Sequence, residues 1–207
     1  WILAKFNSLI LEVTKDFENY NFSQAAEKLR EFTWNDFADW YLEISKIEGG
    51  KEKILNEILE KLLILWHPFI PFVTEVIWNE MLGKKNLIIA KWPQIKKREL
   101  KKQAEKDFEK IKELIVKIRN LRSENKIEPG KTINLEIISK DKKLFNDNLA
   151  IIEGLVKSKI ELKVSKLVAP KIKILIDELD RQKNKIRFEK ELSEKESYVV
   201  SLKKKLE

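Results

Sequence analysis

The stretch from Asn21 to Tyr41, NFSQAAEKLREFTWNDFADWY, decides how the first half of the chain folds. Apolar side chains recur in it at helical spacing, which predicts a helix from a Ser23 N-cap to about Lys46. These side chains cover much of the helix circumference, so the helix should be central in its domain. They are Ala25, Ala26, Leu29, Phe32, Trp34, Phe37, Trp40, Tyr41 and Ile44.

Three further amphipathic helices are predicted around this one. Residues 1–18 and 51–66 each carry an apolar stripe, and a third helix follows the two prolines after His67 and runs to about Met81. Four antiparallel helices with short connections make a bundle. We expect the apolar run Leu87–Ala90 to pack back on this bundle as an extended segment.

The second half of the chain changes in character. A long charged helix is predicted over 98–125, and Pro129-Gly130 then turns the chain. Alternating apolar residues predict two strands, at 133–137 and 159–164, with a helix over 141–154 between them. This pattern indicates a small α/β unit.

The residues after Pro170 contain neither glycine nor further proline, and their apolar residues form a near-heptad stripe. That pattern is typical of half a coiled-coil arm or of one long amphipathic helix. We therefore predict a mainly α chain with three parts: an antiparallel helical bundle at 1–97, a long helix plus small α/β unit at 98–167, and a C-terminal coiled-coil arm at 168–207, expected to be truncated.

The composition agrees with a mainly helical protein. Charged residues make up 37% of the 207 residues, and glycine and proline number only five each, so helix breaks are few. The chain has no cysteine, which excludes disulfides and thiolate metal sites and is compatible with a reducing compartment. His67 is the single histidine, which excludes a multi-histidine metal site, and we expect it to hydrogen-bond its turn.

Charge is unevenly distributed along the chain. Residues 1–93 hold 11 basic and 14 acidic residues, a net charge of −3, whereas residues 94–207 hold 31 and 20, a net charge of +11. All six tryptophans lie in the first segment. The second segment could meet a polyphosphate, although Lys/Glu-rich sequences of this kind also form merely solvated helix faces.

Four segments, in order, resemble the C-terminal region of valyl-tRNA synthetases, a class I aminoacyl-tRNA synthetase family. They are the aromatic stretch quoted above, His67–Trp78 (HPFIPFVTEVIW), Ile118–Lys131 (IRNLRSENKIEPGK), and Leu175-Ile176-Asp177 leading into a Lys/Glu-rich helix. The resemblance covers nearly the whole chain. Leucyl and isoleucyl enzymes share the aromatic bundle and the His-Pro motif, so the tail of one of those remains an alternative.

This resemblance implies a class I anticodon-binding domain that receives the anticodon stem-loop, followed by a coiled-coil arm that reaches the outer corner of the tRNA. The implied function is the tRNA-binding C-terminal part of a valine–tRNA ligase, which works in the cytoplasm as a monomer and binds valine-accepting tRNA but neither DNA nor a membrane. A non-catalytic helical protein-interaction module is the alternative from another class.

Bond-making chemistry is expected to lie elsewhere. The chain has no His-Ile-Gly-His or Lys-Met-Ser-Lys-Ser type motif and no glycine-rich phosphate loop. We therefore expect no catalytic residue, no metal site and no cofactor here. ATP and Mg²⁺ would be used by the catalytic domain of the parent enzyme, and this chain alone should be inactive.

Two groups of residues are the candidates for tRNA contact. Unstacked RNA bases stack on aromatic rings and are read at their edges, which favours Trp34 with Asn35, while Phe37, Trp40 and Tyr41 are expected in the core. Basic and amide side chains near the Pro-Gly turn could bind phosphates. These are Arg119, Asn120, Arg122, Asn125, Lys126 and Lys131. Alternatively, the two arginines pair with carboxylates of the bundle and serve structure.

Overall fold

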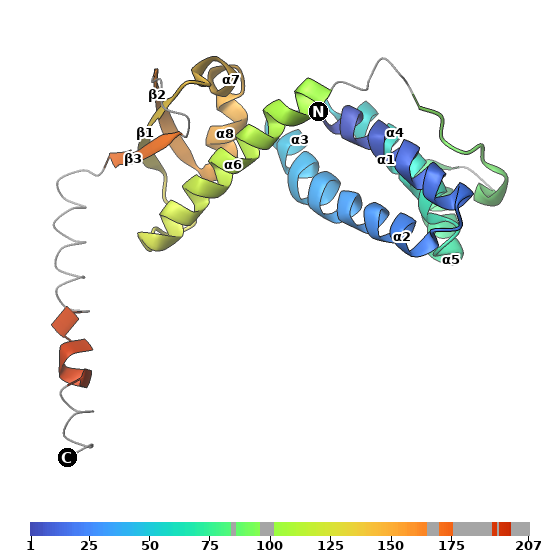
Figure 1. Ribbon diagram of the computed structural model, residues 1–207, viewed down its shortest axis with the longest axis horizontal. Coiled ribbons are helices and arrows are strands. Elements are labelled where there is room, and N and C mark those ends of the chain that lie inside the picture. The colour runs from blue at the N-terminus through green and yellow to red at the C-terminus, as the bar shows by residue number, and fades with distance from the viewer. Residues whose placement is uncertain (84–85, 96–101, 165–169, 176–191, 194, 200–207) are drawn as a thin grey trace. The chain divides into compact units, whose positions relative to one another are not determined.

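The structure is a computed structural model that describes residues 1–83, 86–95, 102–164, 170–175, 192–193 and 195–199 (Figure 1). Two compact units make up the chain, and each is described by itself. The first comprises Trp1–Lys126 and Lys143–Val156, and the second comprises Ile127–Lys142 and Lys157–Glu207. The domain boundaries near residues 97 and 167 stay predictions.

The first unit begins with the predicted helical bundle. Its helices are α1 (Ile2–Glu18), a long helix in three segments, α2 (Phe22–Glu31), η1 (Phe32–Leu42) and α3 (Glu43–Glu48), then α4 (Glu52–Trp66) and α5 (Pro71–Leu82). The prediction of a Ser23 N-cap is wrong, because Asn21 caps this helix and does so without a side-chain hydrogen bond. Tyr20 makes the preceding turn possible by adopting a φ of 59°.

The middle of the long helix is widened. Phe32–Leu42 is a π-helix, so its backbone hydrogen bonds reach one residue further than in an α-helix. Its buried residues Phe32, Asp36, Trp40 and Tyr41 are accordingly spaced by four and five positions. In an α-helix of 3.6 residues per turn, positions with this spacing do not form a single stripe. The sequence therefore predicted apolar residues around most of the helix circumference.

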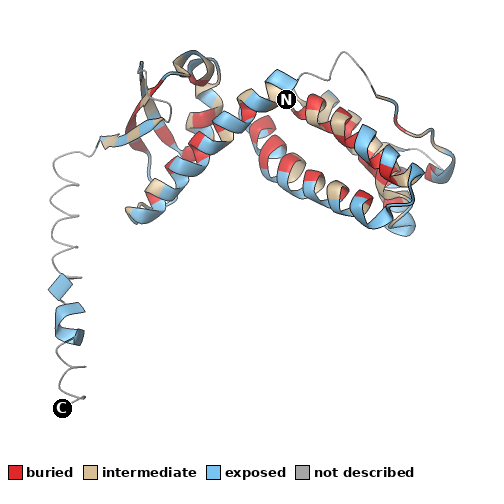
Figure 2. Cartoon of the chain, viewed as in Figure 1, coloured by how far each residue is buried: buried red, intermediate tan, exposed pale blue. Residues whose placement is uncertain are grey.

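The main core lies between α1, the long helix and α4. Phe6, Ile10 and Val13 of α1 are buried in one cluster with Leu29 and Phe32 of the long helix. Ile58 and Leu65 of α4 belong to the same cluster. Figure 2 shows buried residues recurring along α1 and along the long helix, with exposed residues between them. A smaller cluster joins Leu63, Trp78 and Leu87.

The chain leaves α5 through Gly83, whose φ of 63° suits the left-handed C-cap position. The prediction of an extended Leu87–Ala90 segment is wrong for its first three residues, which form the 3₁₀ turn η2 (Leu87–Ile89), while Ala90 is extended. The following residues do pack back on the bundle. Trp92 Nε1 donates to Thr14 Oγ1 of α1 at 2.8 Å, and its ring meets Phe17 edge-on.

Helix α6 (Lys102–Glu124) is held to the bundle by aromatic contacts. The ring of Phe108 stacks on Trp1 with their centroids 3.6 Å apart, and it meets Trp40 edge-on at 5.9 Å. The predicted helix over 141–154 is two helices, α7 (Lys142–Asp147) and α8 (Leu149–Val156). Gly154 lets α8 approach Ile47 of α3 closely, because a Cβ at this position would lie 2.8 Å from Ile47 Cδ1.

The second unit contains a small sheet with strand order β2-β1-β3. Strand β1 (Ile133–Ser139) pairs in parallel with β2 (Ser158–Val164) and antiparallel with β3 (Lys171–Leu175). The two-strand prediction missed β3, whose sequence KIKIL alternates with period two but was assigned to the terminal helix. Most of the predicted C-terminal arm lies outside the described residues, although 195–199 are helical.

Candidate nucleic-acid interface

Trp34 and Asn35 lie on the outer side of the π-helical segment. The neighbouring Phe32 and Asp36 are buried in the bundle, whereas Thr33 is half-buried and Trp34 and Asn35 are turned toward solvent. Trp34 is 64% exposed and Asn35 is exposed as well. An indole presented in this way offers a flat apolar face next to an amide that can both donate and accept hydrogen bonds.

The other aromatic residues of the stretch fill the interior, as predicted. Trp40 and Tyr41 are buried, and Phe37 is half-buried against the main core. Burial raises the pKa of the Tyr41 hydroxyl, and the nearby Glu48 carboxylate adds to this shift.

Trp40 also organises two basic side chains of α6. Lys112 Nζ and Arg119 Cζ each lie 5.4 Å from the centroid of its ring, which is cation–π distance. Arg119 Nη2 further donates to the Leu155 carbonyl at 3.5 Å. Arg119 is exposed, so its guanidinium is anchored on one side and faces solvent on the other. The sequence reading missed Lys112, since its partner lies 72 positions earlier in the chain.

The C-terminal half of α6 and the turn that follows it are basic. Residues 110–126 contain six basic residues and two acidic ones, a net charge of +4. Asn120 and Lys126 are exposed, and Asn125 is half-buried with its Nδ2 donating to the Leu121 carbonyl at 2.8 Å. Such a local excess of positive charge attracts polyanions.

Arg122 and Lys131 differ from the residues just described. Arg122 was a candidate for phosphate contact, but it is only 7% exposed, and loss of hydration lowers its pKa. A guanidinium in this position is not presented to a phosphate, which suits the structural alternative. Lys131 is exposed and belongs to the second unit.

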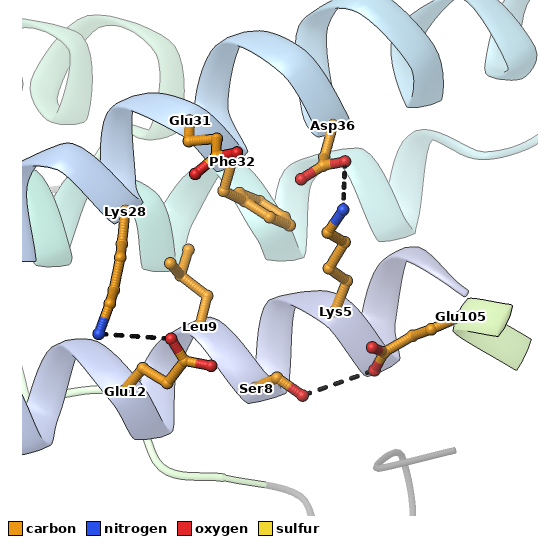
Figure 3. Close-up of a pocket in the computed structure, with 9 residues that line it drawn as sticks. All are labelled: Lys5, Ser8, Leu9, Glu12, Lys28, Glu31, Phe32, Asp36 and Glu105. Carbon is orange, nitrogen blue, oxygen red and sulfur yellow. Dashed lines mark hydrogen bonds and ion pairs between the residues drawn. The ribbon is translucent and has the colours of Figure 1, made fainter. Parts of the chain in front are cut away.

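A cavity of about 230 Å³ opens between α1, the long helix and the start of α6 (Figure 3). Lys5 Nζ lies 2.7 Å from Asp36, and Lys28 Nζ lies 3.4 Å from Glu12. Burial of Lys5 opposes its charge, but the hydrogen bond and the charge of Asp36 outweigh this and raise its pKa. The lining holds four carboxylates against two ammonium groups, so it does not favour a phosphate. We interpret it as a site where ion pairs hold neighbouring helices together.

His67 has the structural role expected of it. Its Nδ1 hydrogen-bonds Thr74 Oγ1 at 2.8 Å, across the turn between α4 and α5. Within the described part of the chain, no group of three or more histidine, cysteine or carboxylate side chains is arranged to hold a metal ion. The described helices include none with the length and apolar character needed to span a membrane.

Comparison with known proteins agrees with this architecture. The family model described as "Anticodon-binding domain of tRNA ligase" matches residues 1–138. The chain is 38% identical to a valine–tRNA ligase of Petrotoga mobilis over 168 residues, which cover 75% of this chain and 19% of that protein. Valine–tRNA ligases of Thermotoga maritima and Carboxydothermus hydrogenoformans align with all of this chain, at 31% and 33% identity, and each is covered to 26%.

The chain thus spans about a fifth to a quarter of the length of the curated relatives that it matches. The match of the family model covers the bundle, α6 and most of β1. The helical architecture and the predicted resemblance are confirmed together, and the chain belongs to the family of anticodon-binding domains of tRNA ligases.

Proposed function

We propose that the chain is the tRNA-binding C-terminal part of a valine–tRNA ligase. It would hold the anticodon stem-loop of valine-accepting tRNA and so position the tRNA for ATP-dependent charging by a catalytic domain elsewhere in the ligase. One observation carries the proposal: valine–tRNA ligases align over all of this chain, including the region beyond residue 138 where the family match ends.

The proposed binding mode assigns base contacts to the π-helical segment. Trp34 stacks on an unstacked base of the anticodon loop, and Asn35 reads the edge of a base. Exposure of both side chains supports this assignment. Aromatic stacking on a base contributes about 1–3 kcal/mol and tolerates any base, so the identity of the base must come from edge contacts.

Phosphate contacts are assigned to the basic half of α6. Arg119 is the leading residue, because Trp40 and the Leu155 carbonyl fix one side of its guanidinium and leave the other for a phosphate. Asn120, Asn125 and Lys126 supply further donors at and just after the end of α6, and Lys131, in the second unit, is assigned a phosphate contact of its own. Arg122, being buried, is assigned to holding the end of α6 in place.

In this proposal the chain contributes binding energy and tRNA identity, while ATP, Mg²⁺ and valine are handled by the rest of the ligase. The C-terminal arm expected over 168–207 would contact the body of the tRNA with the part of the chain that follows strand β3. The protein acts in the cytoplasm as a monomer.

Two alternatives make different predictions. The tail of a leucyl or isoleucyl enzyme would prefer another tRNA, and the valine–tRNA ligases found by comparison favour the valyl assignment. A helical protein-interaction module would bind a protein and show no salt-sensitive RNA binding. Membership in an anticodon-binding family favours RNA over this alternative.

The test is competitive binding of the 207-residue chain to valine tRNA and to a tRNA with another anticodon, at two salt concentrations. We expect valine tRNA to win clearly at the higher salt. If binding of both tRNAs is lost together as salt rises, the chain makes only a nonspecific electrostatic contact with RNA. This result would contradict the proposal.

A further inference from the structure

Helix α5 exposes large apolar side chains on the side away from the bundle. Phe72 is 87% exposed, and Val73 and Val76, which lie on the same side within about one turn, are exposed as well. The opposite side of α5 carries Thr74 and Trp78, which are buried. The first two turns of α5 therefore expose apolar side chains where a surface helix of a globular protein normally has polar ones, and the exposed polar residues Asn79 and Glu80 follow only in the last turn.

The turn η2 extends this apolar surface. Leu87 is buried in the cluster with Trp78, and its backbone N–H donates to Glu75 Oε2 of α5 at 3.0 Å. These contacts fix η2 against α5. They leave Ile88 and Ile89 exposed at 78% and 76%. We call Phe72, Val73, Val76, Ile88 and Ile89 the α5 face. Among the described residues, none covers it.

The charge of this region disfavours RNA as the occupant. Helix α5 contains two glutamates and no lysine or arginine, and the basic residues Lys84 and Lys85 follow it in the chain before η2. RNA binding depends on neutralising phosphates, and the five apolar side chains of the α5 face offer a phosphate no partner. A group of exposed large apolar side chains is instead typical of a surface that contacts another protein surface.

We propose that the α5 face docks against the remainder of the ligase, and this rests on the function proposed above. The relatives carry about three quarters or more of their length outside the match, so a large protein surface is available in the same polypeptide. Docking through apolar side chains of α5 and η2 keeps the basic half of α6 free for tRNA. The contact would fix the distance between the anticodon-binding bundle and the catalytic part.

The experiment compares Phe72→Asp with Leu11→Asp, a matched control that places the same charge at an exposed apolar position of α1. Both are made in the full-length ligase and in the 207-residue chain, and Ile88→Asp serves as a second variant outside any long helix. Limited proteolysis of the full-length ligase measures docking, and titration of the 207-residue chain with valine tRNA measures RNA binding. Circular dichroism checks that each variant is folded.

We expect Phe72→Asp and Ile88→Asp to speed proteolytic cleavage between the anticodon-binding part and the rest of the ligase roughly tenfold. This change corresponds to about 1.4 kcal/mol of docking free energy. Leu11→Asp should leave cleavage unchanged, and none of the three should alter the affinity of the chain for tRNA. Unchanged cleavage in both test variants would overturn the proposal. So would a wild-type chain that sediments as a dimer and becomes monomeric with Phe72→Asp, since a second copy would then be the occupant.

The two proposals fail differently. If the wild-type chain shows no preference for valine tRNA but the cleavage results hold, the function assigned to the RNA surface is wrong and the docking face stands. If tRNA preference is present and cleavage is unchanged, only the docking proposal falls. A loss of tRNA affinity in Phe72→Asp would mean that the face binds RNA, which also overturns it.

Discussion

Trp34 and Tyr20 are both strongly exposed aromatic residues of the first unit, but only Trp34 lies on the π-helical segment assigned to the anticodon. Replacing Trp34 by alanine should weaken binding of valine tRNA roughly 5- to 150-fold, as expected for the loss of about 1–3 kcal/mol of base stacking. Fluorescence titration measures the affinity. Tyr20→Ala is the control, and an equal loss in both variants would remove the special role of Trp34.

Arg119 is expected to contribute to the salt dependence of tRNA binding. Removing one phosphate contact with Arg119→Ala should lower the slope of log K against log salt concentration by roughly 0.7 to 0.9. Titrations at four salt concentrations measure this slope. Arg30, which is exposed and paired with Glu27 at 2.5 Å on α2, provides the control Arg30→Ala. A slope that is the same in Arg119→Ala as in the wild type would show that Arg119 touches no phosphate.

Glu136 gives the sheet of the second unit a dependence on pH. The hydrogen bond from Lys163 holds the pKa of this carboxyl below its usual value, and Lys173, 3.5 Å away on β3, contributes in the same direction. A carboxyl with a lowered folded-state pKa contributes stability that is fully present above the unfolded pKa and is lost as pH falls through the folded one.

We therefore expect Glu136→Gln to remove part of the acid sensitivity. Between pH 7 and the region below the ordinary glutamate pKa, the free energy of unfolding of the wild type should fall more than that of the variant. Denaturant unfolding followed at a series of pH values measures this difference. Parallel curves for the two proteins would contradict the role given to the ion pairs of Glu136.

At the scale of elements, periodicity predicted the bundle well and failed where the backbone departs from the α-helix. The stripes of α1 and α4 lie at regular spacing, and both helices were predicted to within a residue or two. The π-helical segment η1 could not be read from apolar spacing, because large apolar residues such as Trp34 and Trp40 occur on both its exposed and its buried sides. Strand β3 was missed because five alternating residues do not outweigh the helical pattern that follows them.

The candidate site was only partly readable for the same reason. Exposure of Trp34 and burial of Trp40 follow from which side of η1 meets α1 and α6, and this depends on the turn width. Burial of Arg122, three positions after the exposed Arg119, likewise depends on tertiary packing and not on its residue type. The motifs identify the segment that carries the site, while packing decides which of its side chains reach solvent.

The contact between α3 and α8 gives a prediction at this scale. A Cβ on Gly154 would lie 2.8 Å from Ile47 Cδ1 and 3.2 Å from its Cγ1 and Cγ2, so Gly154→Ala should destabilise the first unit. In an Ile47→Ala background the same change should stabilise it by up to about 1 kcal/mol, because alanine favours helix over glycine. A double-mutant cycle measured by thermal unfolding checks this reversal of sign, and equal effects in both backgrounds would contradict the close contact.

At the scale of the molecule, charge and apolar surface are separated. The C-terminal half of α6 and the turn after it carry +4 over residues 110–126, whereas α5 contains no basic residue and, together with η2, presents exposed apolar side chains. The first surface suits a polyanion and the second suits a protein. In the proposed arrangement, the chain binds tRNA with the first surface and the rest of the ligase with the second.

The most direct test of the central claim is binding of the chain to one valine tRNA body whose anticodon has been exchanged for another triplet. Because the body is unchanged, general contacts with phosphates stay the same and only anticodon recognition differs. We predict that affinity falls at least roughly tenfold at near-physiological salt, as expected when matched base-edge contacts are lost. Equal affinity for both tRNAs would contradict the claim that this chain recognises the anticodon of valine tRNA.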